Sequence, residues 1–307
     1  MCCFTGPINR VSDTKIFARL DGDRQAIAYA MAFETEQPVA MVLPIPVAAG
    51  PESEAVTFVT LPESSRFFEE LASGFPALPD DTSSLGPIAR SASAPMPQPL
   101  VVHRVGNFVA SFVPTMNDFD RLDPVFRIAP ETWAQVPGYQ SFGFVVFQLR
   151  ELSGQPKPMA FWFKTTTPNQ LFFPTLHIHD GTIHSHESFD HVLYVQGDAF
   201  DQGAGAYTNQ LDSNTGLVRS RDPAGSFVSN SAGLIIPSGL VHRKLLRGHF
   251  PNQDTLVSLQ VPPWGAAKRW TGIGALAMLG LSGLTGLGWL IWRRNKLKQK
   301  SSGESAQ

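Results

Sequence analysis

Cysteine is scarce in this chain of 307 residues, because Cys2 and Cys3 are its only cysteines and they are neighbours. Adjacent cysteines rarely bridge one another, so the sequence excludes an internal disulfide framework and leaves the redox compartment open. Charged side chains are also few, at 16% of residues. Outside a basic C-terminus the chain is mildly acidic. We therefore expect no nucleic-acid partner, since such binding depends on neutralising phosphates.

Known catalytic signatures are missing as well. The sequence has no Gly-x-Ser-x-Gly elbow, P-loop, dinucleotide fingerprint or His-Glu-x-x-His pair. It is rich instead in phenylalanine, with 22 residues, and it contains 26 glycines and 25 prolines. Short extended segments joined by tight turns fit this composition better than long helices do. The sequence predicts a mainly β body of the α+β type, antiparallel, with a few short helices.

Predicted strands run through the whole body. The turn Asp21-Gly22-Asp23 joins two of them as a hairpin, and Val39–Val47, with two prolines, is predicted as an edge or bent strand. The other predicted strands are Thr14–Leu20, Gln25–Phe33, Ala55–Thr60, Leu100–Val105, Asn107–Val113, Phe142–Leu149, Met159–Lys164, Thr175–Leu193, Ser226–Ser229, Leu234–Pro237, Val241–Leu246 and Thr255–Val261. Helices are predicted over 62–73, with a capping box from Thr60 to Glu63, and over 115–122 and 130–136.

Composition divides the chain into six segments. Residues 1–74 form an N-terminal β-rich part with one helix, and residues 75–99 a proline-rich loop or linker. Residues 100–262 form a second β-rich part that holds a histidine hairpin. A juxtamembrane link at 263–269, a transmembrane helix at 270–292 and a basic tail at 293–307 complete the chain.

The run from Trp270 to Trp292 has twenty-three residues and no charge. A helix needs roughly 20 apolar residues to cross a bilayer, and tryptophans favour its two interfaces. This run predicts a single-pass anchor in the lipid bilayer. Glycines spaced by three, at Gly280, Gly283 and Gly286, indicate self-association of that helix.

Charge around the anchor predicts its direction. Five Lys and Arg residues follow it, against Lys268 and Arg269 before it. The positive-inside rule then places the tail in the cytoplasm and the body outside. Export needs a signal peptide, but Met1 is followed by Cys-Cys-Phe-Thr-Gly-Pro, without a basic region or an apolar core. The alternatives are a start further upstream or a tail-anchored protein with its body inside.

Five of the eight histidines lie within fifteen residues, between His177 and His191. If Asp180-Gly181 is a two-residue hairpin turn, His177 pairs with His184, and four imidazoles share one face. These four predicted metal ligands are His177, His179, His184 and His186, with support from Asp180, Glu187, Asp190 and His191. Imidazole suits zinc, copper, nickel or iron, so the expected cofactor is a divalent transition metal. A structural or interaction protein without a metal site is the alternative.

A second ligand set comes from a resemblance. The segment His184–Gly197, followed by Pro237-Ser-Gly239-Leu-Val-His242, resembles the two metal motifs of the cupin barrel. This resemblance implies a metal-dependent enzyme with His184, His186, Asp190 and His242 as ligands. The sequence departs from the pattern in having Asp190 in place of glutamate and Ser231 in place of a glycine.

Another resemblance extends over more of the chain. It rests on Cys2-Cys3-Phe4, Val39–Val47, Asn107–Pro114, Gly143–Leu149 and Pro158–Pro174, closed by the anchor and basic tail. In order and spacing these segments are similar to a family of uncharacterised bacterial exported domains of unknown function. The family typically has a signal peptide, a β-rich domain and a C-terminal transmembrane helix. The resemblance implies a location facing the cell envelope, and no reaction.

Overall fold

The computed structural model describes residues 3–48, 52–62, 64–78, 103–105, 108–149, 151–201 and 216–259, all within one compact unit, residues 1–262. The predicted membrane helix with its flanking link and tail lies outside these ranges, as do residues 79–99 of the proline-rich segment. Within the described ranges, no helix has the length and apolarity to cross a membrane. The described body is mainly β, with antiparallel sheets and short helices, which confirms the predicted class.

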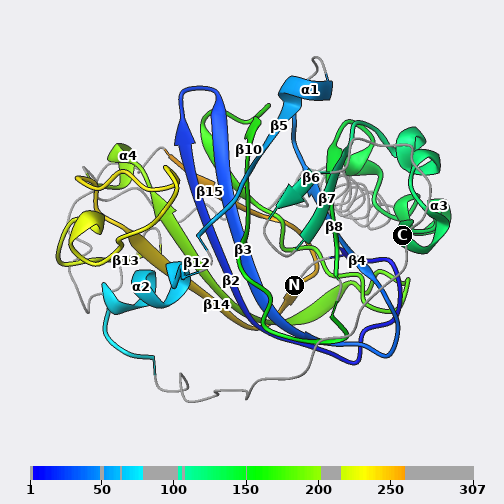
Figure 1. Cartoon of the computed structure of the whole chain (residues 1–307), viewed down its shortest axis with the longest axis horizontal. Helices are drawn as coiled ribbons and strands as arrows, with labels where there is room; N and C mark the ends of the chain where they lie inside the picture. The colour runs from blue at the N-terminus through cyan, green and yellow to red at the C-terminus, as the bar shows by residue number, and fades with distance from the viewer. Residues whose placement is uncertain are drawn as a thin grey trace, which may run out of the picture. The chain divides into compact units, whose positions relative to one another are not determined.

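An eight-stranded sheet runs through the body, with the β2–β3 hairpin in its middle (Figure 1). Its order is β13-β14-β12-β2-β3-β10-β5, and β9 pairs with the end of β3. The pairing of β12 with β2 is parallel. The bounds are β2 (Arg10–Asp21), β3 (Arg24–Glu34), β5 (Val56–Val59), β9 (Ser153–Gly154), β10 (Met159–Lys164), β12 (His186–Gln196), β13 (Val218–Arg219) and β14 (His242–Pro251). The predicted hairpin is confirmed, since Asp21 pairs with Arg24 across the turn.

A five-stranded sheet of order β1-β4-β8-β7-β6 packs on the first. Its bounds are β1 (Cys3–Phe4), β4 (Ala40–Ile45), β6 (His103–Val105), β7 (Phe108–Val113) and β8 (Gly143–Gln148), and a separate two-stranded sheet joins β11 (Gln170–Phe173) to β15 (Thr255–Ser258). Of the two alternatives predicted for Val39–Val47, an edge or a bent strand, the edge strand is wrong, because β4 lies between β1 and β8. Within β4, the partners of β1 are Met41 and Val42, so Pro44 needs no donor on that side.

Three hydrophobic clusters cover the faces of the two larger sheets. The largest lies between the two sheets and includes Ile27, Phe161 and Phe147. A second cluster covers the other face of the large sheet, where α2 (Phe67–Ser73) packs on Phe17 and Tyr194. A third covers the outer face of the small sheet with Phe119 and Trp133. Alternate residues of β2 enter different clusters, because both faces of this strand are buried.

The helices are short: α1 (Glu52–Ala55), α2, η1 (Met116–Arg121), η2 (Pro124–Phe126), α3 (Pro130–Trp133), η3 (Pro137–Tyr139), α4 (Asp198–Asp201) and η4 (Ala224–Ser226). α2 starts later than predicted, and its N-cap Arg66 makes no side-chain capping bond. The strands predicted at 226–229 and 234–237 do not form. In the second segment the carbonyls accept from side chains instead, since Arg19 Nε donates to Leu234 O at 2.6 Å and Gln196 Nε2 to Ile236 O at 2.7 Å.

Gly143 begins β8 where the two sheets come together. A Cβ at this position would lie 2.7 Å from both Phe112 Cε2 and Val47 Cγ1, closer than real contacts allow. We expect Gly143→Ala to destabilise the fold by about 1–3 kcal/mol, the usual cost of overpacking. Gly138→Ala is the control, because no described atom beyond its chain neighbours lies within 4 Å of the place that its added methyl group would occupy. Urea unfolding measures both, and equal midpoints for the two variants would contradict this packing.

Candidate functional site

The histidine segment between β11 and β12 pairs with the N-terminus instead of with itself. Cys3 bridges Ile178 in parallel, and Phe4 N donates to Ile178 O at 2.9 Å. The predicted hairpin, with His177 opposite His184, is therefore wrong. Asp180-Gly181 still turns the chain, but as a local turn in which Asp180 Oδ1 accepts from Thr182 N at 2.9 Å. Ile178 is fully buried, and this burial draws the segment into the third cluster.

His177 lies beneath the inner face of β12, with an exposure of 1%. Its ring centre is 4.3 Å from that of Phe189 and 5.4 Å from that of His191. Asn252 holds its backbone, because Asn252 Oδ1 accepts from His177 N at 2.7 Å and Asn252 Nδ2 donates to His177 O at 2.9 Å. Packing and these two hydrogen bonds fix its position.

His179 stacks on His177, with ring centres 5.2 Å apart and ring planes 23° apart. Its Nε2 atom is buried and has no hydrogen-bond partner among the described residues. Burial lowers the pKa of His177 far below the ordinary value for histidine, and it lowers the pKa of His179 to about 4. Both imidazoles are therefore neutral at pH 7.

His184 and His186 lie in solvent, on the other side of the turn. His184 Nε2 is 3.2 Å from Asp180 Oδ2, and more than half of each side chain is exposed. His186 begins β12 on its outer face, with Nδ1 3.3 Å from Ser185 Oγ. The structure thus divides the four predicted ligands into a buried pair, His177 and His179, and an exposed pair.

The predicted supporting acids have separate partners. Glu187 Oε2 is 4.0 Å from His177 Nδ1. Asp190 Oδ2 accepts from Asp13 N at 2.7 Å, at a bulge of β2 where Asp13 has a φ of 54°. Asp190 therefore stabilises a left-handed backbone position that costs energy for most residues.

The predicted four-histidine metal centre is not assembled in the described part of the chain. No group of three or more His, Cys, Asp or Glu side chains there is arranged to hold a metal ion. His177 and His179 cannot share a metal ion because of how their rings are oriented. A metal binds in the plane of an imidazole, and the nitrogens of two stacked rings point along separate planes. Core packing prevents these rings from turning.

The cupin-like ligand set is not brought together either. His186 pairs with Pro251 at one end of the β12–β14 ladder, and His242 pairs with Val195 at the other. Nine residues of strand separate these positions, or about 30 Å at the usual rise per residue. His184 and His186 therefore cannot share an ion with His242.

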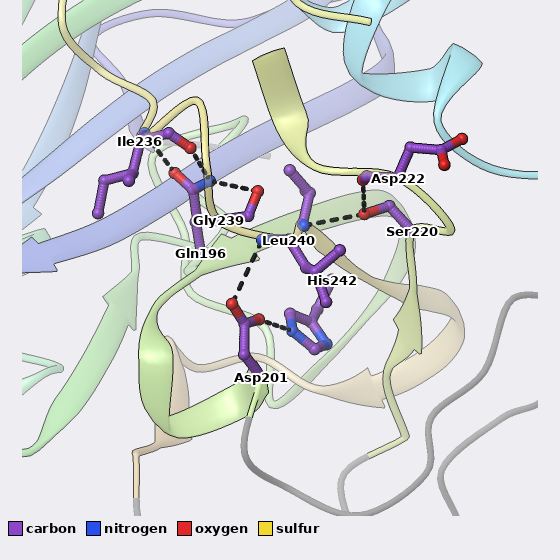
Figure 2. Close-up of polar contacts among 9 residues, drawn as sticks. Gln196, Asp201, Ser220, Asp222, Ile236, Gly239, Leu240 and His242 are labelled. Carbon is purple, nitrogen blue, oxygen red and sulfur yellow. Dashed lines mark hydrogen bonds and ion pairs between the residues drawn. The ribbon is translucent and has the colours of Figure 1, made fainter. Parts of the chain in front are cut away.

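His242 belongs instead to a polar network at the far end of β12, shown in Figure 2. Its Nε2 atom is 2.9 Å from Asp201 Oδ1, and Asp201 Oδ2 accepts from Leu240 N at 3.3 Å. Ser220 lies nearby, but its hydroxyl donates to Asp222 O at 2.9 Å and accepts from Val241 N at 3.1 Å. A serine nucleophile needs its hydroxyl to be hydrogen-bonded to the histidine that acts as base. The network holds loops against β12 and does not activate a nucleophile.

One polar group that sequence reasoning missed is Asp254, in the turn before β15. Asp254 Oδ1 accepts from Thr175 N at 2.7 Å and from Leu176 N at 2.9 Å, and Tyr139 Oη donates to Oδ2 at 2.5 Å. Burial raises the pKa of this carboxyl to about 6, against the opposing effect of the hydrogen bonds. Asp254 follows Asn252 in an ordinary polar turn, so no sequence signal distinguishes it.

Comparisons with known proteins give distant similarities. No protein-family model matches the chain, and no curated protein matches it significantly. The crystal structure of baculovirus P35 aligns at 13% identity over 85% of this chain and 100% of that chain, with a TM-score of 0.43. A chain in the crystal structure of the caspase-8/P35 complex aligns at 13% identity over 80% of this chain and 96% of that chain, with a TM-score of 0.41. These TM-scores are too low to establish a common fold.

The buried His179 makes stability depend on pH. Its folded pKa of about 4 lies below the value of 6.5 for a free histidine, so its contribution is present above pH 6.5 and is lost as pH falls towards 4. Between pH 7.5 and 4.5, we expect the native chain to lose about 2 kcal/mol more of its unfolding free energy than His179→Phe does. Urea unfolding at both pH values measures this. The control, His103→Phe at an exposed site, should follow the native chain, and parallel curves for His179→Phe would contradict the assignment.

Asp254 changes the pH dependence of stability in the opposite direction to His179. Its folded pKa of about 6 exceeds the free value of 3.8, so its contribution is present below pH 3.8 and is lost as pH rises through 6. Asp254→Asn keeps a neutral side chain at every pH. We expect the stability of the native chain relative to this variant to fall by about 2 kcal/mol between pH 4 and 7. The exposed Asp222→Asn is the matched control. A constant difference between native chain and Asp254→Asn would show that burial does not raise this pKa.

Proposed function

We propose that this chain is a single-pass membrane protein whose β-rich body is displayed outside the cytoplasm as a non-catalytic structural or interaction domain. The observation that carries the proposal is the uncharged run from Trp270 to Trp292, with tryptophans near both ends and a basic tail behind it. Outside a bilayer, a helix formed by this run would expose a long apolar surface to water. Its Gly280, Gly283 and Gly286 spacing supports self-association in the bilayer.

The arrangement of polar groups in the body supports a non-catalytic role. The side chain of His242 is hydrogen-bonded to that of Asp201. Asp201 and Ser220 form their other hydrogen bonds with backbone atoms of neighbouring loops. Asp190 binds the bulge of β2, and Asp254 binds the chain that enters the histidine segment. These side chains satisfy the backbone where it leaves the strands, as polar groups in a structural role do.

Membrane insertion is tested by placing a charge in the centre of the run. Arginine at the middle of a transmembrane helix costs about 2.5–3.5 kcal/mol in insertion. We expect the full chain to remain in membranes after alkaline carbonate extraction, and Leu281→Arg to be released in part or completely. Leu297→Arg, in the basic tail beyond the run, is the control and should stay bound. Release of the unchanged chain by carbonate would overturn the anchor.

The side of the membrane is tested separately, by protease accessibility. Flanking charge places the body outside and the tail inside. Protease added to intact host cells should therefore digest the body and spare an epitope fused after Gln307. Digestion of the epitope with protection of the body would reverse the topology and leave the anchor itself standing.

A further inference from the structure

Two exposed imidazoles form a pair that sequence spacing does not reveal. His186 at the start of β12 and His249 on β14 have ring centres 5.6 Å apart. In the antiparallel ladder His186 pairs with Pro251 and Ser188 with His249, so the two histidines occupy diagonal positions on the same face. Sixty-two residues of chain separate them, and only the pairing of β12 with β14 brings them together.

The spacing of this outer histidine pair, His186 and His249, suits a shared metal ion. Imidazole nitrogens bind zinc at about 2.0–2.1 Å, which places the ring centres of two such ligands about 5 Å apart. The rings are 22° from parallel, so they must turn before both nitrogens meet one ion. Unlike His177 and His179, both residues are exposed, and solvent leaves them room to turn.

A neighbouring hydroxyl orients one of the two rings. His186 Nδ1 lies 3.3 Å from Ser185 Oγ. When Nδ1 donates its hydrogen to this oxygen, Nε2 carries the lone pair that a metal requires. Metal-binding histidines are commonly fixed in this way by a hydrogen bond at the other ring nitrogen.

We propose that the outer histidine pair is a surface site for a divalent transition metal, with His186 and His249 as the two protein ligands and water completing the coordination. The site differs from the four-histidine set predicted from sequence, since it takes one member of that set and adds a residue from another strand. It does not depend on membrane anchoring. With two imidazole ligands, copper and nickel are expected to bind more tightly than cobalt or manganese.

Calorimetry with Ni²⁺ on the purified full chain tests the site. We expect His186→Ala and His249→Ala each to weaken binding at least about tenfold, since even residues behind a ligand commonly contribute that much. His184→Ala, which removes an exposed imidazole two residues from His186, is the matched control and should bind as the native chain does. Circular dichroism checks that the variants fold.

Residue-resolved footprinting separates this site from the alternatives. Diethylpyrocarbonate acylates accessible imidazoles, and peptide mass spectrometry locates the product. Ni²⁺ should protect His186 and His249 while His184 and His103 remain reactive. Unchanged reactivity of the pair, or nickel affinity that depends on His177 and His179 instead, would overturn the proposal. Neither result would affect the carbonate extraction that tests the anchor.

Discussion

The parallel pairing of β12 with β2 is the contact on which the rest of the structure depends. It joins residues near the start of the chain to residues 177 positions later, with Lys15 beside Val192 and Arg19 beside Gln196. It ends at the bulge around Asp13, where Asp190 takes over the backbone hydrogen bond. Closing such a long loop is entropically costly, so this pairing needs the apolar burial on both faces of the sheet to stabilise it.

That pairing also decides the environment of every histidine along β12. Strand alternation directs His191 and Phe189 inward onto His177, whereas His186 faces outward next to His249. His177 therefore becomes a neutral core side chain, held by Asn252 and by packing. The outer ones, His186 and His249, keep access to solvent. Burial, more than residue type, decides which of these histidines belong to the core and which stay exposed to solvent.

Patterns among neighbouring residues correctly predicted the elements that depend on short-range signals. Alternation and the Asp21-Gly22-Asp23 turn located the β2–β3 hairpin, and the apolar run at Met159–Lys164 matched β10. The same turn chemistry misled at Asp180-Gly181, because Ile178 gains more from the third cluster and from pairing with Cys3 than from a hairpin. Leu234 and Ile235 resemble a strand in sequence, yet Arg19 and Gln196 bind that loop from a distance.

The sequence by itself determined the β-rich class, the hairpin at the centre of the large sheet and the presence of a long uncharged run near the C-terminus, because each follows from neighbouring residues. It also concentrated histidines in one segment. Only the tertiary structure decided which of them lie together. Separation of His242 from His186, burial of His177 and the meeting of His186 with His249 all follow from strand pairing between distant segments. The free energy of that pairing comes from apolar surface contributed by the whole fold, which no local pattern contains.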